Sequence, residues 1–205
     1  MTSKLLYRPL LIGVAILALA GCNKEANTTE KMASAENGPA SATNSTAAAP
    51  SDPVQSAESA APASIAHNAS IVTMDANGNS KVVRKGSNGW TCIPDSPTTP
   101  GPDPMCMDSS AMKWADAWMH HKPPPQGIVG VMYMLEGGTD ASNTDPYATQ
   151  PTPQNDWIKT GPHVMIVGSK EVLAGYPSGQ KPDTSAPYVM WAGTPYEHLM
   201  VPIGK

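Results

Sequence analysis

Short runs of alternating apolar residues constrain the fold of this chain more than any other feature of its sequence. Successive side chains of a β-strand point to opposite faces of a sheet, so a period of two indicates strands with one buried face. The first run holds two alternating segments around Ala-Asn-Gly-Asn, which predicts a hairpin. The runs cover residues 70–86, 127–138, 162–168, 187–193 and 197–203.

One segment, residues 109–122, has helical rather than strand periodicity. Asp108 or Ser109 can cap its first turn, and three consecutive prolines follow its last residue. The segments 86–108 and 137–161 are rich in Pro, Gly and Asn and are predicted to be long loops. The sequence therefore predicts an α+β fold, with a mostly antiparallel sheet of about six strands and one packed helix.

The N-terminus carries an export signal. Two basic residues precede an apolar stretch, residues 10–20, which is too short to span a bilayer and ends in Leu-Ala-Gly-Cys. This pattern resembles the lipobox of bacterial lipoproteins. The resemblance implies that residues 1–21 are a signal peptide and that Cys22 carries the lipid, and Asn23 implies sorting to the outer membrane. The alternative is an ordinary secretory signal with an incidental cysteine.

Residues 22–63 contain almost no large apolar side chain and are rich in Ala, Ser, Thr and Pro. Such a segment buries too little surface to offset the entropy lost on ordering, which predicts a flexible tether with a reach of roughly 35 Å. The alternative, a weak alanine-rich helix, is interrupted by four prolines. Residues 64–205 are expected to form a single domain. The formal net charge of −4 argues against nucleic acid as a partner.

Two cysteines remain once Cys22 is lipidated. Cys92 and Cys106 bracket a proline-rich segment, and in an exported protein such a pair predicts a disulfide. Closing a loop of about 15 residues stabilises a fold by roughly 3 kcal/mol in the chain-entropy model. The alternative is metal ligation by the two thiolates, with Met105 and Met107 as neighbours.

The chain has 12 methionines and no phenylalanine, so Met and Trp must fill much of the core. Alternation places His163 with Met165, and His198 with Met200, on one face of their strands. The expected arrangement is a second core layer under the helix. The two histidines should then be buried near Trp114 or Trp118, each bonded to a backbone or carboxylate partner.

The alternative for the same four residues, His163, Met165, His198 and Met200, is a copper site. Imidazole and thioether ligands select soft metals such as Cu(I), and a His-x-Met pair on a strand directs both side chains to one side. The paired motif resembles that of periplasmic copper chaperones. Those proteins also carry a methionine about twenty residues before the motif, and the corresponding positions here are Ala141 and Tyr176. The family is therefore not assigned.

Recognisable catalytic motifs are missing from the sequence, including G-x-S-x-G, H-E-x-x-H, the P-loop and G-x-G-x-x-G. This favours a protein without catalysis. His120 and His121 at the helix end suit a helix C-terminus by their charge, with metal binding as the sharper alternative. A hydrolase with a dispersed site, built from Asp140, Glu197 and His198, is a further alternative.

Long stretches of the domain, among them "PMCMDSSAMKWADAWM", "GGTDASNTDPYA" and "PYVMWAGTPYEHLMVP", resemble an uncharacterised family of secreted bacterial proteins. This resemblance implies no activity. The sequence thus predicts an outer-membrane lipoprotein, anchored through Cys22 with its domain in the periplasm, that binds an unknown protein or small ligand without catalysis. Copper binding and hydrolysis are the two alternatives.

Overall fold

The computed structural model describes residues 52–75, 79–153 and 156–204, all of which belong to one compact unit, Thr46–Lys205. The predictions for the signal peptide, for Cys22 and for residues 22–51 of the tether lie outside the described residues. Within the described ranges, no helix has the length and apolar character needed to cross a membrane.

The main sheet has eight strands. They are β1 (Ser70–Met74), β2 (Ser80–Arg84), β3 (Thr91–Ile93), β4 (Met105–Met107), β5 (Gly130–Met134), β8 (His163–Val167), β9 (Tyr188–Met190) and β10 (His198–Pro202). Their order across the sheet is β2-β1-β3-β4-β5-β8-β10-β9. A second, two-stranded sheet pairs β6 (Gly138–Asp140) with β7 (Ile158–Thr160).

The predicted mixture of helix and sheet is confirmed, as is the hairpin formed by β1 and β2. The predicted count of about six strands is too low, and the sheet is mixed because β1 and β3 run parallel. The missed strands of the main sheet, β3 and β4, have three residues each and flank the proline-rich segment. Three residues are too few to establish a period of two, so pattern alone does not reveal them.

Two short helices precede the sheet, the first within the predicted tether and the second at the predicted start of the domain. They are α1 (Pro53–Ser59), whose first turn is capped by the carboxylate of Asp52, and α2 (Ala63–Ala66). Arg84 of β2 donates hydrogen bonds to the carbonyls of Ala66 and Ala69, and its guanidinium also pairs with Glu58. The folded region therefore includes residues 52–63, which the sequence assigned to the tether. Alanine side chains bury little area but allow a helix to lie close to a sheet, which composition alone does not show.

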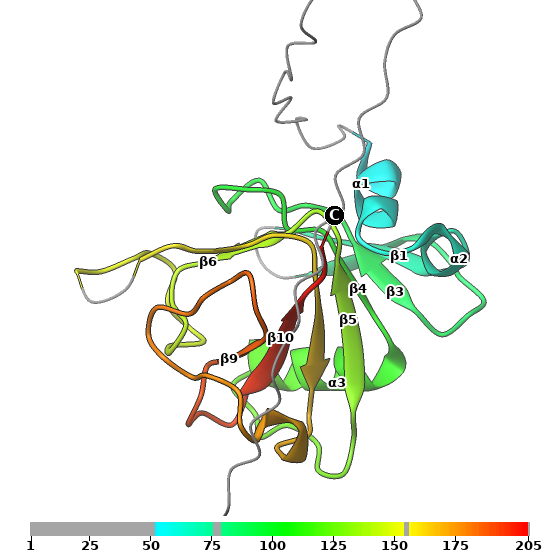
Figure 1. Ribbon diagram of the computed structural model, residues 1–205. Coiled ribbons are helices and arrows are strands. Elements are labelled where there is room, and N and C mark those ends of the chain that lie inside the picture. The colour runs from blue at the N-terminus through cyan, green and yellow to red at the C-terminus, as the bar shows by residue number, and fades with distance from the viewer. Residues whose placement is uncertain (1–51, 76–78, 154–155, 205) are drawn as a thin grey trace, which may run out of the picture. The chain divides into compact units, whose positions relative to one another are not determined.

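Helix α3 (Ser109–Met119) lies across one face of the sheet (Figure 1). Asp108 caps it through Ser110 and Ala111, and its other carboxylate oxygen accepts a bond from the backbone N–H of Val131 in β5. A side chain at Gly130 would lie 2.4 Å from the backbone nitrogen of Ala111, so this close approach requires glycine. One cap thus fixes both the start of the helix and its position on the sheet. A 3₁₀ turn, Glu171–Leu173, follows β8.

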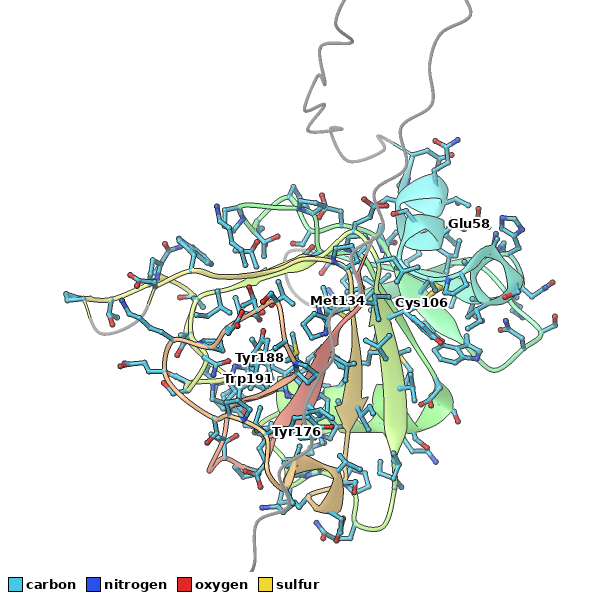
Figure 2. The ribbon with its side chains drawn as sticks, viewed as in Figure 1. Glu58, Cys106, Met134, Tyr176, Tyr188 and Trp191 are labelled. Carbon is cyan, nitrogen blue, oxygen red and sulfur yellow. A yellow bond between two sulfur atoms is a disulfide. The ribbon has the colours of Figure 1, made fainter. Side chains whose placement is uncertain are left out.

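The two faces of the sheet carry different cores. Cys106 and Met107 are adjacent in β4, so their side chains point to opposite faces, and each belongs to a different cluster. Figure 2 labels Met134, Tyr188 and Trp191 of the first cluster and Cys106 of the second. The methionine cluster contains Met107, Met132, Met134, Met165, Met190 and Met200 with Trp114, Trp191, Tyr188 and Tyr196. The alanine cluster contains Ala57, Ala60, Ala61, Ala66, Ala69, Ile71, Cys92 and Cys106.

Candidate functional site

Strand register arranges the methionine face in rows. Met132, Met165 and Met200 lie side by side on β5, β8 and β10. On one side of this row His163 is paired with Met134, and on the other side His198 is paired with Met190. Both imidazoles are buried, as the sequence predicted. The four predicted residues therefore share one face, with the histidines at its two ends.

The separation of the two histidines follows from the same register. His163 lies opposite Pro202, which is four residues from His198 on the same strand. At about 3.3 Å per residue, this offset is roughly 13 Å along the strand direction. The two imidazoles therefore have different neighbours, although both line one cavity.

Trp191 joins this face through an unusual backbone conformation. Continued alternation after β9 would place the side chain of Trp191 on the opposite face from Met190, but its φ of 55° lies in the left-handed region. Its N–H donates to the carbonyl of Asn143 at 2.8 Å and its indole N–H donates to the carbonyl of Ser142 at 3.1 Å. The ring consequently stacks parallel to Trp114, with centroids 6.3 Å apart. A left-handed tryptophan held by two such bonds indicates a position fixed for more than packing.

Between the methionine face, α3 and the segment 139–150 lies a cavity of about 950 Å³. Its walls are largely Met and Trp side chains. At the rim His121, with a left-handed φ of 54°, stacks on Tyr147 with centroids 3.9 Å apart. The segment is fastened to the helix because the indole of Trp118 donates to the carbonyl of Pro146. Apolar walls with a few polar groups are typical of a ligand site.

Each imidazole on the methionine face has one bonded and one unbonded nitrogen. Nδ1 of His163 lies 2.7 Å from the carbonyl oxygen of Gly161, and Nδ1 of His198 lies 2.9 Å from that of Tyr196. A carbonyl only accepts, so each Nδ1 carries the proton and each Nε2 presents a lone pair. Both Nε2 atoms are buried without a hydrogen-bond partner, which costs about 1–3 kcal/mol for each group. Each ring therefore has the expected hydrogen-bond partner at Nδ1 but none at Nε2.

Burial keeps both rings neutral. It lowers the pKa of His163 and lowers that of His198 to about 4, against a weaker opposing effect of the carbonyl bonds. A positive charge on His163 would also lower the pKa of His198. At neutral pH each Nε2 is therefore available to a hydrogen-bond donor or a metal ion.

Carboxylates also line the cavity. Burial, together with the nearby charge of Asp103, raises the pKa of Asp140 to about 7. Burial likewise raises the pKa of Asp103 to about 6, against the bonds it accepts from Ser96 and Thr99. Asp145 completes the set, and among the described residues that line the cavity none is Lys or Arg. The site is therefore acidic and lacks a built-in counterion.

The remaining predicted residues do not assemble into sites. The thiolate alternative is wrong because Cys92 and Cys106 are joined by the predicted disulfide. His120 pairs with the exposed Asp116 of its own helix. In the part of the chain that the structure describes, no group of three or more His, Cys, Asp or Glu side chains is placed to hold a metal.

The dispersed hydrolase site is not brought together. Glu197 pairs with Lys170 at 2.8 Å and accepts the N–H of Gly193. The bonded nitrogen of His198 meets a backbone carbonyl and not the carboxylate of Asp140. A general base oriented by a carboxylate, which such chemistry requires, is therefore not formed by these residues.

Three site features were not predicted from the sequence. Asp103 comes from the proline-rich segment, where Asp is common for turn formation. Trp191 depends on a backbone angle, and the direct opposition of Met134 to His163 depends on register. No protein-family model matches the chain, and searches of curated proteins and of solved structures return no significant match. The function must therefore be argued from the cavity itself.

Proposed function

We propose that the protein is a lipid-anchored periplasmic binding protein, without catalytic activity, whose cavity accepts a small organic cation with an apolar body. The observation that carries this proposal is the make-up of the cavity walls. Carboxylates at Asp103, Asp140 and Asp145 combine with aromatic side chains, and no Lys or Arg lines the cavity among the described residues.

The size of the cavity suits a single small molecule. Ligand sites for drug-sized molecules enclose about 300–1,000 Å³, and this cavity encloses about 950 Å³. Its apolar wall of Met and Trp side chains would cover the ligand body. Aromatic faces at Trp118, Tyr147 and Trp157 attract cations through their quadrupoles.

Asp140 supplies the expected point of charge recognition. Its side chain is partly buried, burial and the charge of Asp103 raise its pKa to about 7, and among the described residues no cation pairs with it. A bound ammonium group would lower the cost of ionising this carboxyl and would gain a charge-assisted interaction. The proposal therefore predicts that the ligand carries a positive charge close to Asp140.

Binding is tested by titrating the mature protein with benzyltrimethylammonium and following Trp fluorescence. Its neutral isostere, neopentylbenzene, and a benzoate serve as comparisons. We expect the cation to bind best and Asp140→Asn to weaken it about tenfold, which corresponds to roughly 1.4 kcal/mol. The matched control is Asp156→Asn, because Asp156 is exposed and pairs with Lys181 on the surface. Equal affinity for the neutral compound, or an unchanged affinity in Asp140→Asn, would contradict the proposal.

The anchor is tested separately. Replacing Cys22 by Ser removes the thiol that would receive the lipid. We expect this variant to move from the membrane fraction to the soluble periplasmic fraction, because the lipid on Cys22 is the membrane attachment that the sequence predicts. A variant that still sediments with carbonate-washed membranes would refute the lipoprotein assignment.

A further inference from the structure

We propose that one end of the methionine face is a Cu(I) site formed by Nε2 of His163 and the thioethers of Met134 and Met165. This inference rests on a different observation from the organic-cation proposal and goes beyond it. It concerns the imidazole and thioether groups that line the cavity, whereas the cation proposal concerns the carboxylates.

The three side chains occupy neighbouring positions in the sheet. Met134 is the direct cross-strand partner of His163, and Met165 lies two residues along the same strand on the same face. All three are buried. Gly138 of β6 covers this end, and a Cβ built there would lie 3.4 Å from Cε1 of His163 and 3.6 Å from the sulfur of Met134. Imidazole and thioether therefore converge beneath one glycine.

The lone pair of His163 is prepared for a Lewis acid. The carbonyl of Gly161 holds the Nδ1 proton, which fixes the tautomer and leaves Nε2 as the free donor atom, as in many metal-bound histidines. Nε2 is shielded from solvent and has no hydrogen-bond partner. Thioethers cannot donate a hydrogen bond, so the surrounding methionines cannot satisfy it. A metal ion held between nitrogen and sulfur would satisfy it.

The chemistry of these ligands selects the ion. Neutral imidazole and thioether donors are soft and carry no charge, which suits Cu(I) and not Mg²⁺ or Ca²⁺. A structural Zn²⁺ site is usually built with four protein ligands and often with thiolates. Both cysteines of the described domain are committed to the disulfide. A monovalent soft ion is thus the best match.

His198 at the opposite end has different surroundings. Its ring meets Trp114 and Trp191 edge-on, with centroids 5.3 and 4.9 Å apart. No aromatic ring contact to His163 is found within the described residues. Met190 and Met200 lie beside His198 as Met134 and Met165 lie beside His163, but within the described residues tryptophan rings contact only His198. This difference assigns the ion to the His163 end and makes the His198 end a matched internal control.

The test is an anaerobic competition of the mature protein against bicinchoninate for Cu(I). We expect one equivalent to bind. Loss of an outer-shell partner alone typically costs about 10–100-fold in metal affinity. The variants Met134→Leu, Met165→Leu and His163→Asn should therefore each weaken binding roughly 100-fold. Met190→Leu and His198→Asn should leave affinity within about twofold, since neither residue is a proposed ligand.

Methyl NMR keeps the proposal testable if His163→Asn fails to fold. Addition of Ag(I), a redox-inert substitute for Cu(I), should shift the methyl resonances of Met134 and Met165 and leave that of Met190 in place. Stoichiometric Cu(I) binding that survives in the Met134→Leu, Met165→Leu double variant would overturn the proposal. So would an equal loss of binding in His198→Asn. In the unsubstituted protein Cu(I) binding is measured with bicinchoninate and benzyltrimethylammonium binding by Trp fluorescence, so loss of one signal alone shows which of the two proposals has failed.

Discussion

The two faces of the sheet are covered by cores of different composition. The alanine cluster joins small side chains from α1 and α2 to a disulfide between neighbouring strands. The methionine cluster uses large, flexible side chains and borders a cavity of about 950 Å³. In the described part of the chain, all four buried polar atoms without a partner belong to Trp114, Asn143, His163 and His198, none of which lies in the alanine cluster.

This difference indicates a division of roles. Unsatisfied polar atoms and a left-handed tryptophan are unfavourable for stability, and such features concentrate where a protein binds or reacts. The alanine face carries none of them and is fastened by a covalent bond and by the Arg84 contacts. We infer that the alanine face stabilises the fold while the methionine face is kept for ligand. The following predictions test this contrast.

The largest effect is expected from removal of the disulfide. The double variant Cys92→Ala, Cys106→Ala should lower the free energy of unfolding by about 3 kcal/mol, because the closed loop of about 15 residues no longer restricts the unfolded chain. Urea denaturation measures this change. Ligand affinity at the methionine face should stay unchanged at temperatures where the variant is folded. A large loss of benzyltrimethylammonium affinity in the folded variant would show that the two faces do not act separately.

A smaller loss is expected when the alanine cluster is overfilled. Ala57 belongs to α1, and its side chain is fully buried where the helix packs on the sheet. Ala57→Leu should destabilise the protein by about 1–3 kcal/mol, because the larger side chain forces the helix away from the sheet. Thermal unfolding measures this. The matched substitution Val54→Leu in the same helix, at a half-buried position, should cost less. Equal costs at both positions would argue against tight packing at Ala57.

The alternating pattern of the sequence was sufficient to predict the methionine face. It placed His163 with Met165 and His198 with Met200 on a buried face beneath the helix, because a period of two persists over five residues in β8 and β10. The alanine face was missed. Its strands β3 and β4 are too short to show a period, and the composition of α1 resembles that of a disordered tether.

Chain geometry limited the prediction of the site in a different way. The register that sets His163 opposite Met134 depends on pairing between segments about thirty residues apart, which no local pattern records. The left-handed backbone of Trp191 reverses the side that alternation assigns to its ring. Asp103 approaches Asp140 only because the proline-rich segment folds back over the cavity. These features arise from tertiary contacts.

The pH dependence of stability should also separate the faces. Asp140 has a folded-state pKa raised from 3.8 to about 7 by burial, so the folded protein holds this proton more tightly than the unfolded chain. Stability from this group is fully present below pH 3.8 and is lost as the pH rises through about 7. Asp140→Asn should therefore gain stability relative to the wild type as the pH rises from 3.8 to about 7. Denaturation at a series of pH values measures the slope, with Asp156→Asn as the exposed control. Parallel curves for Asp140→Asn and the wild type would contradict the raised pKa.

The smallest effect is expected at the centre of the methionine face. Met165 and Met200 are buried cross-strand neighbours, and replacing each by Leu nearly conserves volume. In the protein without metal, each change should cost less than about 1.5 kcal/mol, because flexible methionine fills space without a specific shape. Calorimetric unfolding measures the cost, with Ala57→Leu as the comparison on the other face. If Met165→Leu proved as costly as Ala57→Leu, the methionine face would be packed as tightly as the alanine face. Its side chains could then not move to admit a ligand to the neighbouring cavity. If Met165→Leu instead lowered the free energy of unfolding only slightly but greatly weakened Cu(I) binding, the sulfur of Met165 would matter for binding and not for packing.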